Sequence, residues 1–196
     1  MPYTDFNWVT DRIAVGALVS QHEDFPFDAI LSMATEAPPT VRDIVHSGRV
    51  DYQWRPIVDG YSWEEHDEIV RRYDAAAAQI DMWQRDGKRV LVHCMAGVSR
   101  SATSVVWYLV RYQGYGWDEA VELLRRSRPQ VNPNIRFEIP LRLALGEELT
   151  EEWVGRRIAE HCAWVEETTG IRLDEAEIKE DLERQGTLGR LQVAAT

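Results

Sequence analysis

The sequence predicts an α/β fold, in which a mostly parallel central sheet has helices on both of its faces. Two observations favour this class. Short apolar runs alternate with longer amphipathic segments through about residue 145. This alternation is typical of chains in which each strand is followed by a helix that packs on a face of the sheet. One apolar run, over residues 90–92, leads through a glycine-containing loop directly into an apolar helix, the order found where α/β sheets bind ligands.

The expected strands are short apolar or alternating runs. Two of them flank Thr10-Asp11 and predict a hairpin. The predicted strands cover residues 6–9, 12–16, 29–33, 50–54 and 90–92.

The longest expected helix begins with the capping-box pattern Ser62-Trp63-Glu64-Glu65 and ends before Gly87. Apolar residues recur on one face of it at three- and four-residue spacing, which predicts a buried face. These residues are Ile69, Tyr73, Ala76, Ile80 and Trp83. Further helices are expected over residues 40–46, from residue 102 to near Gly114, and over residues 118–127.

Residues 150–196 predict a helical C-terminal extension. Its first helix begins at Thr150 and ends at Gly170, and its second begins at Asp174 and ends before Gly186. Both carry an apolar stripe, which predicts docking onto the body of the protein or onto another chain. The stripe residues are Val154, Ile158, Cys162 and Val165, then Ile178 and Leu182.

The composition limits the classes of function. The net charge of −11 over 196 residues argues against a general nucleic-acid or anionic-membrane binder. The start of the sequence predicts no signal peptide, and no apolar run approaches the roughly 18 residues of a membrane span. Two cysteines alone favour a reducing compartment, so a cytoplasmic location is expected. The scattered histidines lack ligand spacing, so neither a metal nor a cofactor is expected.

The loop after residues 90–92 predicts a reactive anion site. At the start of a helix, backbone N–H groups and the helix dipole both favour negative charge. Cys94 ends the strand in that field, so its thiol is expected to ionise readily. Arg100 offers a planar fork for two phosphate oxygens, and Ser101 can donate a hydrogen bond to the sulfur. The implied chemistry is attack of the Cys94 sulfur on phosphorus.

The pair His93-Cys94, five residues and the pair Arg100-Ser101 together resemble the signature of the cysteine-dependent protein phosphatase superfamily. The intervening residues are similar to the dual-specificity branch. The resemblance extends over about residues 6–145, which implies a catalytic domain over residues 1–149 and an extension over residues 150–196. It also implies that the loop residues bind phosphate, namely Met95, Ala96, Gly97, Val98, Ser99 and Arg100.

An acid is needed to protonate the leaving oxygen, and Asp59 is the candidate. The Pro-x-x-Asp context of residues 56–59 resembles the family's acid loop ahead of the long helix. The alternative is a turn aspartate before Gly60. The nearby acids Glu64, Glu65 and Asp67 are better explained by helix capping and surface exposure.

Other side chains are expected to play smaller parts. His93 lies on the strand and is expected to support the loop by hydrogen bonding, not to act as a base. Arg126, Arg128 and Arg136 are candidates for the pocket rim, against the alternative of solvated charges at helix ends. Cys162 is expected to be an inert buried thiol.

The resemblance implies hydrolysis of phosphomonoesters, on phosphotyrosine and also on phosphoserine or phosphothreonine, with a phosphorylated protein or another phosphomonoester as the partner. Alternatives with the same chemistry are phosphoinositide, RNA 5′-phosphate and glucan substrates. The uncharged side chains of Met95, Ala96, Val98 and Ser99 disfavour the first two, since such enzymes tend to carry basic residues in the loop. A rhodanese-like sulfurtransferase and a non-catalytic phosphate-binding module are the remaining alternatives.

Overall fold

The computed structural model describes residues 5–17, 26–35, 48–59 and 65–191. The chain divides into two compact units. The sheet unit comprises residues 1–59 and 72–133, and the helical unit comprises residues 60–71 and 134–196.

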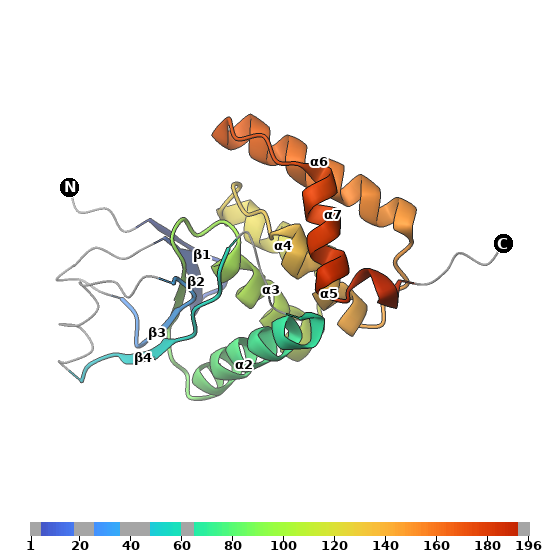
Figure 1. The fold of residues 1–196 in the computed structure, drawn as a ribbon. Coiled ribbons are helices and arrows are strands. Elements are labelled where there is room, and N and C mark those ends of the chain that lie inside the picture. Colours follow the sequence, from blue (N-terminus) through green and yellow to red (C-terminus); the bar gives the residue numbers. More distant parts are fainter. Residues whose placement is uncertain (1–4, 18–25, 36–47, 60–64, 192–196) are drawn as a thin grey trace. The chain divides into compact units, whose positions relative to one another are not determined.

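The sheet unit contains one five-stranded sheet, with the strands in the order β1-β2-β5-β3-β4 (Figure 1). β1 pairs antiparallel with β2, and the other three pairs are parallel. The predicted α/β class and the mostly parallel sheet flanked by helices are therefore confirmed. The strands are β1 (Phe6–Trp8), β2 (Ile13–Gly16), β3 (Ala29–Ser32), β4 (Asp51–Trp54) and β5 (Val90–His93).

β5 occupies the centre of this sheet, between β2 and β3. Every residue of these three strands is buried, whereas the edge strands β1 and β4 are partly exposed. Parallel strands that are covered on both faces are typically continuous apolar runs, as Val90, Leu91 and Val92 are. The strand that leads to Cys94 is thus held on both sides.

Three helices contribute to the sheet unit: α2 (His66–Arg85), whose residues from Arg72 onward belong here, α3 (Arg100–Gln113) and α4 (Trp117–Ser127). α3 packs against β5 and β2, and every residue from Arg100 to Leu109 is buried. Gly114 ends α3 in the left-handed conformation at φ 77°, and its N–H donates to the Leu109 carbonyl. The predicted buried face of α2 is also confirmed, because Ile69, Tyr73, Ala76, Ile80 and Trp83 are all buried.

The helical unit is built from α5 (Ile135–Ala144), α6 (Glu151–Thr169), α7 (Glu175–Arg184) and the 3₁₀ helix η1 (Leu188–Arg190). The two helices predicted for the extension are confirmed, with Thr150 and Asp174 as N-caps. Their apolar stripes meet α5 in one hydrophobic cluster, to which Val165, a half-buried residue of the predicted stripe, does not belong. The cluster contains Ile135, Ile139, Leu149, Val154, Ile158, Cys162, Ile178 and Leu182.

Some predictions differ from the structure or fall outside it. The sequence did not predict α5 and η1. The expected helix over residues 40–46 and the capping-box residues 62–64 lie outside the described residues. The domain boundary after residue 149 stays a prediction; the division into compact units instead places residues 134–149 in the helical unit.

Candidate active site

The candidate site lies in the loop between β5 and α3. The N–H of Cys94 donates to the Gly16 carbonyl at 3.3 Å, which anchors the end of β5 to the neighbouring strand. The Cys94 side chain is buried, and its sulfur accepts hydrogen bonds from the Gly97 N–H at 3.3 Å and the Ser101 hydroxyl at 3.2 Å. Both donors stabilise negative charge on sulfur, as does the positive end of the α3 dipole.

Gly97 allows the loop to turn in a small space. Its φ is +66°, in the left-handed region that favours glycine. A Cβ atom there would lie 2.6 Å from the Gly16 carbonyl carbon and 2.7 Å from its oxygen. Only glycine can therefore pack this closely against the backbone of Gly16. In this conformation the Gly97 N–H points at the Cys94 sulfur.

Arg100 and Asp59 meet beside this loop. Arg100 Nε lies 3.2 Å from Asp59 Oδ2, and the Ser99 hydroxyl donates to Asp59 Oδ1 at 3.0 Å. Arg100 Nη1 also donates to the Ile57 carbonyl at 3.0 Å, which fixes the loop that carries Asp59. Arg100 is buried, whereas the Asp59 side chain is 28% exposed and can be reached from solvent.

The structure thus brings together four residues that the sequence singled out for chemistry: Cys94, Arg100, Ser101 and Asp59. They come from two segments, residues 57–59 and residues 94–101. The Ser99 hydroxyl joins the two segments, and the sequence had suggested only phosphate binding for this residue.

His93 is buried beneath the loop. Burial lowers its pKa to about 4, with the backbone of Cys94 acting in the opposite direction, so the ring is neutral at pH 7. Neither ring nitrogen makes a well-formed hydrogen bond with the described residues. The expected hydrogen-bonding support is therefore not seen, and a supporting role of His93 stays a prediction.

Tyr73 of α2 is a neighbour of the site that the sequence assigned only to the core. Its phenol is fully buried, and burial raises its pKa well above the usual value. The charges of Asp59 and Cys94 raise it further, while a hydrogen bond with Thr103 acts against them. The phenol stays neutral and supplies no charge to the site.

The three arginines suggested for the rim have different places. Arg128 is fully buried, and its guanidinium donates to the carbonyls of Ala96 and Gly97. Arg136 is buried in the helical unit against Asp181, at 2.6 Å. The rim hypothesis is wrong for these two, because their charges are already paired; Arg126 is exposed and stays a candidate.

Two of the acids considered as alternatives to Asp59 are described, Glu65 and Asp67, and both belong to the helical unit. Asp67 pairs with Arg190 at 3.0 Å within the helical unit. Glu65 is exposed at the start of α2, and Glu64 lies outside the described residues.

Two apolar side chains are exposed next to the reactive residues. Val58, which precedes Asp59, is 51% exposed, and Met95, which follows Cys94, is 42% exposed. Such side chains suit an apolar or aromatic group on the substrate.

The described part of the chain contains no group of three or more His, Cys, Asp or Glu side chains arranged to hold a metal ion. Among the described helices, none combines the length and apolar character needed to cross a membrane. Cys94 and Cys162 are both free thiols, and burial raises the pKa of Cys162.

The sequence profile of the family described as "dual specificity phosphatase, catalytic domain" matches residues 13–144. The chain belongs to this family. Dual specificity protein phosphatase 15 of Mus musculus is 48% identical over 108 residues, which are 55% of this chain and 42% of the mouse protein. Dual specificity protein phosphatase 22-B of Danio rerio is 34% identical over 119 residues, 60% of this chain and 65% of that protein.

The tyrosine-protein phosphatase vhp-1 of Caenorhabditis elegans is a longer relative, 26% identical over 136 residues that make up 66% of this chain and 19% of that protein. The matched part of the chain thus spans less than two thirds of the length of each of these three relatives. The family match ends before α6, so it does not extend to residues 145–196.

Solved structures of the family share the fold. Tk-PTP in its active form has a TM-score of 0.60 at 24% identity, and the match covers 74% of this chain and 98% of that one. DUSP15 has a TM-score of 0.59 at 23% identity, covering 81% and 97%. At these identities the likeness establishes the fold alone.

Proposed function

We propose that the chain is a dual-specificity-type phosphatase, which hydrolyses phosphomonoesters on protein tyrosine, and also on serine or threonine, through a phosphocysteine on Cys94. The observation that carries the proposal is the meeting of Asp59 with Arg100 and Ser99 beside the Cys94 loop. A nucleophile, an anion-binding fork and an acid open to solvent are the parts that this reaction requires.

In the first step the Cys94 thiolate attacks phosphorus, and an S–P bond forms as the P–O bond to the leaving group breaks. The Gly97 N–H and the Ser101 hydroxyl stabilise the thiolate before attack. Arg100 binds two phosphoryl oxygens as a planar fork. Asp59 gives its proton to the departing oxygen, which leaves as an alcohol or phenol.

In the second step water attacks phosphorus and the S–P bond breaks, which releases inorganic phosphate. Asp59, now ionised, accepts a proton from the water. The Cys94 sulfur leaves as a thiolate, and the Ser101 hydroxyl at 3.2 Å stabilises the charge that returns to it.

The surroundings of the thiol favour an aryl phosphate carried by a protein. The exposed Met95 and Val58 are apolar, and no loop residue between Cys94 and Arg100 carries a charge that would recognise further phosphates. Relatives named dual specificity protein phosphatases support the same substrate class. Phosphoinositide, RNA and glucan substrates remain the alternatives within this chemistry.

The test is a substrate panel with Cys94→Ser and Cys162→Ser as matched thiol variants. We expect the full chain to hydrolyse phosphotyrosine peptide and aryl phosphate, and Cys94→Ser to lose turnover while still binding inorganic phosphate. Cys162→Ser should retain turnover, because Cys162 belongs to the hydrophobic cluster of the helical unit. A Cys94→Ser variant that keeps wild-type turnover would falsify the mechanism.

The panel also separates the alternatives. If a phosphoinositide, an RNA 5′-phosphate or a phosphorylated glucan is hydrolysed faster than phosphotyrosine peptide, the substrate class changes, and the phosphocysteine mechanism still applies. Sulfur transfer from thiosulfate without phosphate release would identify a sulfurtransferase, and phosphate binding without turnover a binding module. A cytoplasmic location, and the lack of general nucleic-acid or membrane binding, stay predictions from the sequence.

A further inference from the structure

Arg128 follows α4 directly and carries a fully buried guanidinium. Its backbone N–H donates to the Leu124 carbonyl, which makes it the C-cap of α4. Burial of an arginine costs free energy unless its charge and its N–H groups are all satisfied. The hydrogen-bond partners of the Arg128 guanidinium therefore indicate the role of this residue.

Five acceptors meet the five N–H donors of Arg128. Nε donates to the Gly97 carbonyl at 2.7 Å, and Nη2 donates to the Ala96 carbonyl at 2.9 Å. The other side of the guanidinium faces β1 and the residue before it. Nη1 donates to Asp5 Oδ1 at 2.7 Å and Asn7 Oδ1 at 2.9 Å, and Nη2 to Asp5 Oδ2 at 2.9 Å.

The two carbonyls belong to the phosphate loop, and their direction fixes the direction of two N–H groups. In a trans peptide the C=O and the next N–H point in opposite directions, and the described residues contain no cis peptide bond. Holding the Ala96 carbonyl toward Arg128 therefore turns the Gly97 N–H away from it, toward the Cys94 sulfur at 3.3 Å. Holding the Gly97 carbonyl toward Arg128 likewise turns the Val98 N–H away from Arg128.

We propose that Arg128 is a positioning residue, which holds the phosphate loop in its anion-binding conformation by fixing the carbonyls of Ala96 and Gly97, and that Asp5 aligns its guanidinium. The inference rests on the proposed function of the loop. The same loop would otherwise be free to turn carbonyl oxygens toward the anion, which would repel it.

The contacts of Asp5 suit it to align the guanidinium of Arg128. Its carboxylate contacts both Nη atoms, a two-point arrangement that fixes the plane of the guanidinium. The hydrogen bond from Arg128 lowers the pKa of Asp5, against the opposing effect of burial. The ionised carboxylate also balances the charge of Arg128, so that the positive character of the site comes from Arg100 and the loop amides.

A lysine cannot replace Arg128 in this arrangement. An ammonium group has three donors on one nitrogen and cannot reach two carbonyls and two side chains in one plane. The Arg128→Lys variant therefore keeps the charge and loses the geometry. Arg89→Lys is the matched control. Arg89 also makes a two-point contact with a carboxylate, from Nε at 3.1 Å and from Nη2 at 3.2 Å to Asp28, but it precedes β5, whereas the phosphate loop follows β5.

The experiment measures three quantities in the full chain: kcat/KM on an aryl phosphate, inhibition by inorganic phosphate, and the rate at which iodoacetate alkylates Cys94 at neutral pH. Arg128→Lys should lower kcat/KM by about 100-fold, the scale of loss when reacting groups are misplaced by about 1 Å. It should also weaken phosphate inhibition and slow alkylation, since the Gly97 N–H no longer supports the thiolate. Arg89→Lys should change none of the three, because Arg89 pairs with Asp28 at the opposite end of β5 from the phosphate loop.

Thermal unfolding separates this role from a purely structural one. If Arg128→Lys lowers only the melting temperature and leaves the three quantities unchanged below it, the inference is overturned. If Arg128→Lys does not fold, Asp5→Ala decides, because the side chain of Asp5 is 45% exposed and its removal takes away the carboxylate that aligns the guanidinium on the two carbonyls. Wild-type phosphate inhibition and alkylation in Asp5→Ala would equally overturn the inference.

Failure of the proposed function would look different. Absence of wild-type turnover on every substrate in the panel would remove the phosphatase mechanism. Phosphate binding and Cys94 alkylation would still report on the loop in that case. Their loss in Arg128→Lys, and not in Arg89→Lys, would support the positioning role of Arg128 in a loop that only binds anions.

Discussion

Substitution of Asp59 by asparagine tests whether this side chain is the general acid or a turn residue. Asparagine keeps the shape and can still accept the hydrogen bond from Ser99, but it has no proton to give to a leaving oxygen. A general acid typically contributes about 10²–10⁴ in rate. We expect a loss of kcat/KM in that range for substrates whose leaving group needs a proton.

A loss of stability has to be measured separately from the loss of chemistry. The Asp59 side chain is 28% exposed but its partner Arg100 is buried, so the cost of losing the ion pair lies between the about 0–1 kcal/mol of an exposed pair and the about 3–5 kcal/mol of a buried one. A loss of 10²–10⁴ in rate corresponds to about 2.7–5.5 kcal/mol of transition-state stabilisation. Because the two ranges overlap, the melting temperature is measured beside kcat/KM, and a rate loss in the fully folded variant is chemical.

The assay is kcat/KM against a series of leaving groups, for wild type and Asp59→Asn. An acidic nitrophenol leaves without much protonation, whereas the alcohol of phosphoserine needs the proton. The ratio of wild-type to variant rates should therefore rise along the series. The variant should also lack the alkaline fall of the pH–rate profile where an acid loses its proton. Equal ratios for all leaving groups with an unchanged pH profile would refute the reasoning and remove Asp59 from the catalytic residues.

Two further predictions concern Arg100 and the C-terminal extension. Arg100→Lys keeps the charge but cannot donate two parallel hydrogen bonds to phosphate, so kcat/KM on an aryl phosphate should fall strongly. A variant with the wild-type rate would mean that Arg100 acts only as a point charge. Truncation after Leu149 should lower the melting temperature and solubility, because it uncovers Ile135, Ile139 and Leu149, which α6 and α7 cover. A truncated chain that is stable but inactive on a small aryl phosphate would instead give the extension a part in the site.

Much of the sheet and of the reactive loop could be predicted from local patterns. Alternation and apolar runs predicted the five strands. The order of a strand, a tight loop and a helix start predicted that Cys94 ends the strand and that Arg100 begins the helix. The structure also brings Asp59 to Arg100, although a Pro-x-x-Asp sequence alone could equally form a turn. Its catalytic role stays a prediction.

The missed features depend on contacts that no local pattern encodes. α5 contains Pro140, and a proline in a helix interior removes a hydrogen bond and normally indicates a break. Asn134 caps this helix through the Arg136 N–H, and burial in the helical unit compensates for the proline. For Arg128 the sequence predicted either a place at the pocket rim or a solvated charge at a helix end. It could not indicate burial, because the five acceptors come from residues far away in the sequence, near positions 5 and 97.

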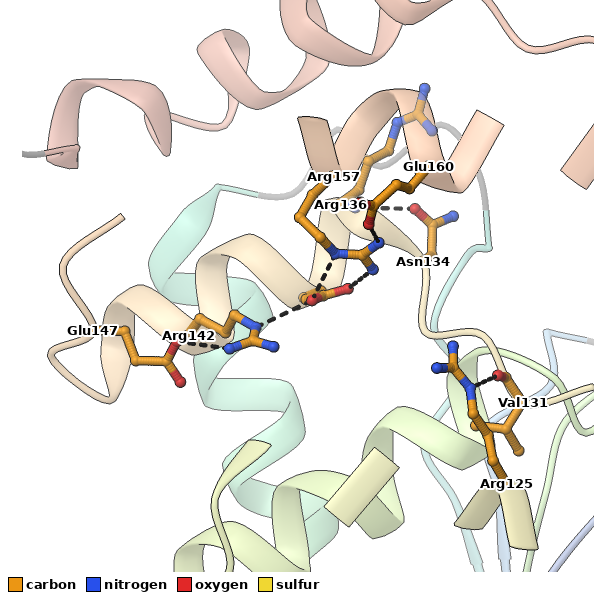
Figure 2. A network of polar contacts seen from close by, with 9 residues as sticks. Arg125, Val131, Asn134, Arg136, Arg142, Glu147, Arg157 and Glu160 are labelled. Carbon is orange, nitrogen blue, oxygen red and sulfur yellow. Dashed lines mark hydrogen bonds and ion pairs between the residues drawn. The ribbon is translucent and has the colours of Figure 1, made fainter. Parts of the chain in front are cut away.

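The charged core of the helical unit allows a last prediction, on stability. Glu138 of α5 is buried and bridges two arginines, Arg142 and Arg157, both of which are labelled in Figure 2. Its Oε1 lies 3.1 Å from Arg142 Nε, and its Oε2 lies 2.7 Å from Arg157 Nη2. In Glu138→Gln the amide oxygen can accept from one arginine, but the amide nitrogen then faces the N–H groups of the other. Breaking a buried ion pair by removing one partner costs about 3–5 kcal/mol. We therefore expect a clear fall in the free energy of unfolding, measured by urea denaturation.

The matched control for Glu138→Gln is Glu166→Gln on α6. Glu166 also accepts from an arginine, Arg172 at 2.9 Å, but both side chains are largely exposed. Water replaces the lost contact there, so the cost should be about 0–1 kcal/mol. The comparison isolates burial, because the same atoms change in both variants. Similar losses would mean that water reaches Glu138 in the folded chain, and that the core of this unit is held by its apolar cluster instead of its charges.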